Sequence, residues 1–256
     1  MSLLDFIMVA LLTIGVLSAG MAFAKQGKNM TSFFAAGGAV PWQTSGLSLF
    51  MSFFSAGTFV VWGSVAYLHG WVAISIQWTM ALAGLLVGTC IAPRWHRTGS
   101  LTVAEYIDKR LGVHVQKTYT FLFLFISLFL TASFLYPVAK IVEVSTGLDL
   151  NLCIILLGAF CILYVSAGGL WAVVSTDVLQ FIILMAAIII VVPLSLERVD
   201  GLHALLSQLP DRYFQLTANE YPLLFILAFG LYNAIFLGGN WAYVQRFTCV
   251  RTSTDA

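Results

Sequence analysis

Long apolar runs alternate with short polar segments along almost the whole chain. A membrane-spanning helix needs roughly 20 predominantly apolar residues, and the chain contains seven runs of about that length. The expected spans are, in order, about 5–24, 42–68, 71–92, 117–142, 149–167, 172–194 and 221–242. Two connections are long, 93–116 and 195–220. The pattern predicts an all-α integral membrane protein in which residues 1–256 form a single transmembrane domain.

The composition agrees with lipid as the solvent of this chain. Hydrophobic residues make up 60% of the sequence and charged residues 9%, with a mean hydropathy of +0.95. Soluble domains average about 45–50% apolar and about 25% charged residues. The net charge of +1 gives no indication of a nucleic-acid partner. The four cysteines show no paired spacing, so we expect small buried hydrophobes and neither disulfides nor metal ligands.

The basic residues indicate how the spans are oriented. No basic segment precedes the first run, so we expect a permanent first helix with its N-terminus outside and no cleavable signal peptide. The inner side then carries nine basic residues: Lys25, Lys28, Arg94, Arg97, Lys109, Arg110, Lys117, Arg246 and Arg251. The outer side carries three: Lys140, Arg198 and Arg212. This excess predicts a multi-pass protein of the plasma (inner) membrane.

The inner 93–116 connection contains a helix signal of its own. Thr102 and Glu105 have the spacing of a capping box, in which each side chain bonds to the other residue's backbone. We therefore expect a short surface helix after Thr102.

Two of the expected spans are interrupted by polar and small residues. In the 42–68 span these are Ser48, Ser52, Ser55, Gly57 and Thr58. In the 221–242 span they are Asn233, Gly238, Gly239 and Asn240. Breaks at membrane depth persist only where they line protein or a wet cavity, and corresponding broken helices point to a midplane site in a transporter. Close packing between helices is the alternative explanation for such residues.

An acid and an amide, Asp177 and Gln180, lie three residues apart where the 172–194 run begins, and therefore on one helix face. Ionisable groups in membrane spans are costly and usually functional. Asp177 could instead cap the start of its helix. A second amide, Gln77, is either an interhelical hydrogen-bonding group or a ligand of a solute.

Several blocks of sequence resemble the sodium:solute symporter family. The most specific is GGLWAVVSTDVLQ at 168–180, which resembles the signature of the family's fifth core helix. The supporting blocks are SFFAAGGAVPW at 32–42, SLFMSFFSAGTF at 48–59, LTVAEYIDKRLG at 101–112 and NWAYVQRFTCVRTSTDA at 240–256.

This resemblance implies the LeuT fold, which has two inverted repeats of five helices. The 5–24 span would be a leading helix, 42–194 the first repeat, and 221–242 the first helix of the second repeat. Members of the family are about twice as long, so the resemblance implies an N-terminal half whose missing C-terminal half is a partner. The implied function is sodium-coupled symport of a small polar solute by alternating access.

The resemblance also implies site residues for Na⁺ and for the solute. The backbone carbonyls of Met51 and Phe54 would bind sodium, and Asp177 would lie on the sodium path or hold a second sodium. The solute would contact residues of three helices: Phe53, Ser55, Thr58, Gln77, Asn233 and Phe236. The 117–142 span has no Arg to clamp a carboxylate, and Leu237 departs from the sugar symporters. We expect a neutral solute, a sugar or polyol.

Two other functions fit a symporter-like membrane domain. One is a sensory module of a signalling protein, which a kinase domain after residue 256 would favour. The other is a scaffold subunit that packs against a partner without transporting. An enzyme is not expected, because the sequence has no HExxH motif, Ser/His/Asp set or paired intramembrane acids.

Overall fold

The computed structural model describes residues 3–22, 29–55 and 57–256, and regular structure in these ranges is helical. Lys25 and Lys28, which entered the orientation argument, lie outside them. In chain order the elements are α1 (Leu3–Ala22), α2 (Met30–Ala35), η1 (Ala36–Gly38), α3 (Trp42–Phe53), η2 (Thr58–Trp62), α4 (Gly63–His69), α5 (Trp71–Cys90), α6 (Ala92–Arg97), α7 (Val103–Leu111), α8 (Val113–Thr146), α9 (Leu150–Glu197), α10 (Gly201–Gln208), η3 (Asp211–Phe214), α11 (Leu223–Gly239) and α12 (Trp241–Thr248). An isolated bridge joins Val40 to Val250.

Several of these helices are long and apolar enough to cross a membrane. Three candidate spans have the length and composition to cross a membrane. The first is α5 together with α6, the second is α8, and the third is α9. Two bent pairs, α3 with η2 and α4, and α11 with α12, each have the length of one broken span. In α8 and in α9, the most apolar stretch of 18 residues has no residue buried inside the protein. This is expected for helix surfaces that face lipid. The protein is thus an all-α membrane protein with several apolar spans.

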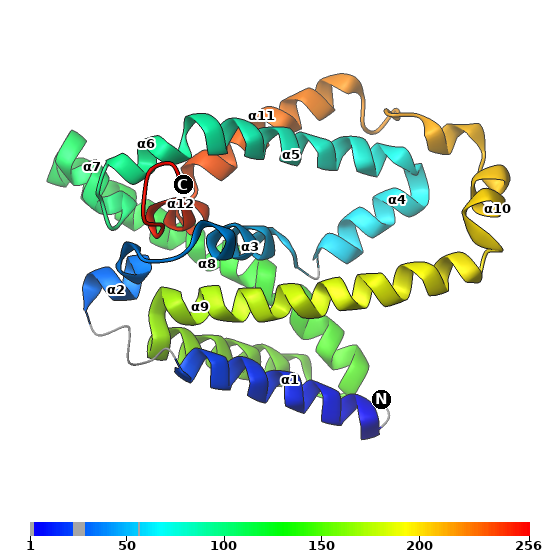
Figure 1. Cartoon of the computed structure of the whole chain (residues 1–256), viewed down its shortest axis with the longest axis horizontal. Helices are drawn as coiled ribbons and strands as arrows, with labels where there is room; N and C mark the ends of the chain where they lie inside the picture. The colour runs from blue at the N-terminus through cyan, green and yellow to red at the C-terminus, as the bar shows by residue number, and fades with distance from the viewer. Residues whose placement is uncertain (1–2, 23–28, 56) are drawn as a thin grey trace.

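The helix α9 contains two passes. Its 48 residues would extend about 72 Å as a straight helix, more than twice the roughly 30 Å of a bilayer's hydrocarbon core. Gly169 interrupts it with φ 58° and ψ −147°, and the ribbon of α9 doubles back in Figure 1. The reversal lies between the two predicted spans, 149–167 and 172–194.

The two spans that carry polar residues are broken, as the sequence predicts. The axes of the pair α3 and η2–α4 differ by 61°, and those of α11 and α12 by 55°. The second span also runs further than predicted, because α12 continues to Thr248 instead of ending near residue 242. Similarly, α8 extends beyond both ends of the predicted 117–142 span.

The short surface helix in the 93–116 connection is confirmed as α7. Its N-cap Thr102 accepts a 3.1 Å hydrogen bond from the Glu105 backbone N–H. The Glu105 carboxylate bonds back to the Leu101 N–H at 2.8 Å, one residue earlier than in a standard capping box.

The helices pack around three apolar clusters. The first joins α5, α6, α11 and α12 through Ala83, Val87, Ala92, Leu237, Tyr243, Val244 and Phe247. The second joins η1, α9 and the segment after α12 through Ala36, Val40, Leu170, Val174, Cys249 and Val250. The third joins α4, α5 and α11 through Val65, Val72, Ala73, Ile76 and Ile226. Lipid is as apolar as these side chains, so close packing rather than transfer from water stabilises such contacts.

Candidate functional site

A cavity of about 470 Å³ lies between the two broken helices. It is lined from α3 and its break by Ser52, Phe53 and Ser55, and from α11 and α12 by Phe236, Asn240, Ala242, Tyr243 and Arg246. A third wall comes from α8, with Phe123, Ser127, Leu130, Thr131 and Phe134. Its lining thus combines hydroxyls, an amide and aromatic rings, the groups that hold and orient a small polar ligand.

The break after α3 is organised by one hydroxyl. The Thr58 Oγ1 accepts a hydrogen bond from the Ser55 N–H at 3.1 Å and donates to the Phe53 carbonyl at 3.3 Å. The Phe54 N–H donates to the Met51 carbonyl at 3.2 Å. Thr58 therefore replaces backbone partners that an unbroken helix would supply.

Aromatic rings connect the break between α11 and α12 to the break after α3. The Asn240 side chain caps α12 by accepting a hydrogen bond from the Ala242 N–H at 3.0 Å. On the next turn Tyr243 stacks on Phe53, with 4.2 Å between ring centroids and 15° between planes. The Phe236 ring meets Tyr243 edge-on at 5.3 Å. Stacked and edge-on pairs stabilise such contacts beyond their buried area, so these rings join the two breaks.

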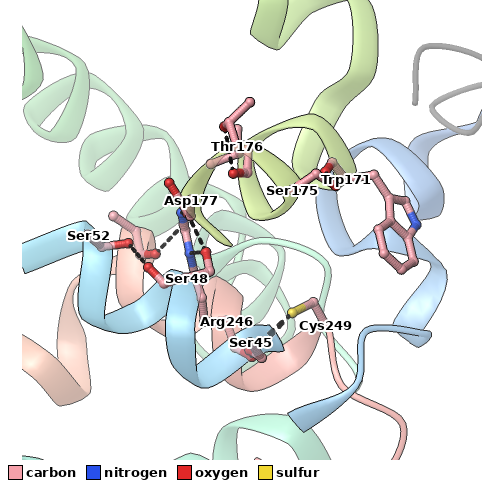
Figure 2. A network of polar contacts seen from close by, with 11 residues as sticks. Ser45, Ser48, Ser52, Trp171, Ser175, Thr176, Asp177, Arg246 and Cys249 are labelled. Atoms are coloured by element: carbon pink, nitrogen blue, oxygen red, sulfur yellow. Dashed lines mark hydrogen bonds and ion pairs between the residues drawn. The ribbon is translucent and has the colours of Figure 1, made fainter. Parts of the chain in front are cut away.

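A buried polar cluster lies beside the cavity (Figure 2). The Ser48 hydroxyl donates a 2.5 Å hydrogen bond to the Asp177 carboxylate. Arg246 donates from Nε to Ser48 Oγ at 3.2 Å, and its Nη2 lies 3.5 Å from the same carboxylate. The Arg246 Nη1 donates to the Ala242 carbonyl at 2.7 Å. The side chains of Arg246 and Asp177 are 9% and 14% exposed. Each buried charge is therefore stabilised by the opposite charge of the other.

This geometry bears on the role of Asp177. Its carboxylate faces α3 and α12 (Figure 2), and Asp177 lies about two turns beyond Gly169, where the second pass of α9 begins. Asp177 therefore does not cap its helix but joins two other helices through Ser48 and Arg246.

The predicted solute residues divide into two groups. Phe53, Ser55 and Phe236 line the cavity, and Thr58 holds the break next to it. Asn233 lies instead between α11 and α5, where it is 1% exposed and its amide donates to Thr79 Oγ1 at 3.0 Å. Gln77 lines a separate apolar groove between α4 and α5. Solute contact by these two amides stays a prediction.

Most of the cavity residues were not predicted as solute contacts, and they include four residues whose polar groups could meet a solute. Ser127 and Thr131 lie one turn apart on α8, Tyr243 follows the second break, and Arg246 lies at the next turn of α12. Their signal in the sequence is weak, because a lone hydroxyl in an apolar run equally indicates helix packing. Arg246 reads as one of the inner basic residues, although it is buried.

The site offers backbone oxygen rather than a cluster of ionisable ligands for a cation. Among the described residues, no group of three or more His, Cys, Asp or Glu side chains could hold a metal ion. The Met51 carbonyl, one of the two predicted sodium ligands, accepts a hydrogen bond from Phe54. A carbonyl oxygen has two lone pairs, so this bond leaves one for a cation.

Comparison with known proteins gives a consistent result. The family model described as "Sodium:solute symporter family" matches residues 33–219. The sodium/glucose cotransporter of Vibrio parahaemolyticus is 25% identical over all of this chain and 51% of its own length. Sodium/glucose cotransporter 1 of Ovis aries is 28% identical over 80% of this chain and 31% of its own.

A solved structure shares the fold. It is a substrate-bound, outward-open Na⁺-coupled sialic acid symporter, with a TM-score of 0.87 and 20% identity. The match covers 99% of this chain and 55% of that one. The chain therefore spans between about a third and about half of the length of these relatives.

Proposed function

Because the chain belongs to the sodium:solute symporter family, whose members are transporters and not enzymes, we propose that it is the N-terminal half of a sodium-coupled symporter. Its solute is neutral and rich in hydroxyl groups, a sugar or a polyol. Sodium and solute are the transported substrates, so Na⁺ acts as a cosubstrate.

The observation that carries this proposal is the position of the cavity between two helix breaks. Unwound backbone at membrane depth is tolerated where it is buried or lines a cavity, and both breaks contribute to the same lining. In this proposal, residues 42–194 supply the first repeat, and α11 with α12 is the first helix of the second. Sodium orders the break after α3, the solute binds beside it, and one bundle rocks against the other.

The chemistry of the lining supports a neutral solute. Arg246 is its one charged side chain, and the Asp177 carboxylate balances it. Hydroxyls of Ser55, Ser127 and Thr131 provide hydrogen bonds, and the rings of Phe53 and Phe236 provide apolar faces for a sugar. The relatives named sodium/glucose cotransporters agree with this choice.

For sodium we propose the backbone carbonyls of Met51 and Phe54 as ligands, since a hard cation prefers oxygen. Asp177 lies on the sodium path toward the cytoplasm. Because Asp177 is paired with Arg246 and Ser48, a sodium ion that binds there has to replace the guanidinium as its partner. In this step, Asp177 exchanges the Arg246 guanidinium for a sodium ion.

The sodium gradient is strong enough to concentrate a neutral solute. The membrane potential contributes about 2.3 kcal/mol per charge at 100 mV, and a tenfold sodium gradient adds about 1.4 kcal/mol. One sodium per solute would therefore sustain a solute gradient of roughly several hundredfold.

Thr131→Val tests the solute site, because valine keeps the shape of threonine and removes its hydroxyl. In proteoliposomes holding a complete transporter that contains this chain, the KM for the preferred sugar should rise about tenfold, since an unpaired solute hydroxyl costs about 1–3 kcal/mol. Thr120→Val is the matched control, because Thr120 bonds to the Gln116 carbonyl of its own helix and does not line the cavity. An unchanged KM in Thr131→Val, or an equal rise in both variants, would contradict the proposed site.

A further inference from the structure

A small slot lies apart from the transport cavity, between the short helices α6 and α7. Its volume is about 180 Å³, and its walls are Ile91, Arg94, Trp95, Thr98 and Tyr106. A slot of this size has room for a small polar group.

Chain connectivity places this slot at the surface of the membrane. The helix α6 continues the α5 span after Ile91, and α7 is separated from α8 by Gly112 alone. In Figure 1, α6 and α7 lie together at one end of the molecule. Beside them, Leu111 and Val113 are 63% and 46% exposed. Basic residues next to exposed apolar side chains are typical of helices at the headgroup boundary.

The rim of the slot is positively charged. Arg94 lines it, Arg97 follows on α6, and the Arg110 guanidinium lies 5.8 Å from the centre of the Tyr106 ring. Within the described residues, none of these three arginines takes part in an ion pair. The Glu105 carboxylate, by contrast, is 2.6 Å from Lys109. The rim therefore presents unbalanced guanidinium groups.

The walls of the slot are held in place without a ligand. The Trp95 indole N–H donates to the Gly238 carbonyl at the end of α11, at 2.7 Å, and its ring meets Tyr106 with centroids 5.0 Å apart. The Thr98 hydroxyl donates to the Trp95 carbonyl at 2.7 Å. A preformed wall reduces the ordering cost of binding, and Trp and Tyr are enriched at the membrane interface.

We propose that this slot binds the phosphate headgroup of an anionic phospholipid. The planar guanidinium of Arg94 matches phosphate oxygens in a bidentate arrangement, and Arg97 on α6 and Arg110 beside Tyr106 add positive charge. Acyl chains would extend past Leu111 and Val113. This membrane position favours a lipid over a soluble phosphate ester.

The test is a titration of dioctanoyl-phosphatidylglycerol into the purified chain in a zwitterionic detergent, followed by native mass spectrometry. A surface arginine contributes about a fivefold gain in affinity for an anionic lipid. Arg94→Gln and Arg110→Gln should each bind the lipid about fivefold more weakly, while Arg94→Lys, which keeps the charge, should lose less. Arg198→Gln is the matched control, because it makes the same charge change at the C-cap of α9, next to α10, which lies at the other end of the molecule from α6 and α7 (Figure 1), and it should bind normally.

Three results would overturn the proposal. One is equal binding of dioctanoyl-phosphatidylcholine, which has the same tails without net charge. Another is an equal loss in Arg198→Gln, which would indicate general attraction. The last is displacement of the lipid by an equal concentration of glycerol 3-phosphate, which would indicate a soluble ligand. Equal thermal midpoints of all variants would show that folding is unaffected, as expected for exposed side chains without ion pairs.

Discussion

At the scale of single residues, the pairing of Asp177 with Arg246 organises the region beside the cavity. The sequence indicates that Asp177 is unusual, because a carboxylate in a membrane span is costly. It does not indicate its partner, because Arg246 lies 69 positions away in a segment that reads as a basic inner loop. Pairing of this kind depends on how α9, α3 and α12 pack, and periodicity within one helix carries no information about that.

Asp177→Asn should destabilise the protein. The change leaves the buried Arg246 without a counter-charge, and breaking a buried ion pair from one side costs about 3–5 kcal/mol. The measurement is thermal unfolding of the purified chain in detergent. Glu197→Gln at the exposed end of the same helix is the matched control and should shift the midpoint little.

The double variant Asp177→Asn/Arg246→Gln separates folding from transport. Removing both charges should recover most of the lost stability, because no unpaired charge remains buried. If Asp177 also lies on the sodium path, a complete transporter with both changes should still need more sodium for half-maximal uptake. A normal sodium requirement would restrict Asp177 to a structural role.

At the scale of helices, the breaks were the most predictable feature. Gly238, Gly239 and Asn240 mark the end of α11, and the Ser, Gly and Thr residues after Phe53 mark the end of α3, because these residues favour breaks and caps. That both breaks face one cavity, with α8 as its third wall, was not predictable. The side chains that join them are aromatic, and aromatic residues in an apolar run equally suit contact with lipid.

Gly169→Ala should impair folding of α9. Gly169 has φ 58°, where a side chain is strained, and an added Cβ would lie 2.7 Å from the Phe33 carbonyl oxygen. The strain alone costs about 1–3 kcal/mol, and the contact forces α2 to move. Gly158→Ala on the same helix is the matched control, because its Cβ would meet the nearest atom at 3.8 Å. Equal unfolding temperatures for the two variants would show that the reversal tolerates a side chain.

At the scale of the whole molecule, the hydropathy pattern predicted several of the apolar spans and their order, because the bilayer imposes a length of about 20 residues on any single pass. It did not predict the extension of α12 to Thr248, since a polar turn after a break resembles a loop. The hydropathy pattern also does not indicate which of the expected solute residues line the same cavity. Gln77 and Asn233 are polar residues in apolar helices, yet the helix faces they occupy turn away from it.

The orientation, with the N-terminus outside, is a prediction of the basic-residue distribution. In a background with the native cysteines replaced by serine, Asp211→Cys should react with a membrane-impermeant maleimide in intact cells. Asp108→Cys should react only after the cells are permeabilised. The reverse pattern would invert the topology and move Asp177 away from the cytoplasmic side.

Sodium-driven uptake of competing solutes tests the central claim most directly. A complete transporter containing this chain is reconstituted in proteoliposomes, and a labelled sugar competes with unlabelled sugars, polyols, amino acids and carboxylates under an inward sodium gradient. A cavity whose single charged side chain is balanced by Asp177 should prefer a sugar or polyol, and uptake should stop when potassium replaces sodium. Strongest competition by an amino acid or a carboxylate, or uptake that does not need sodium, would contradict the proposal.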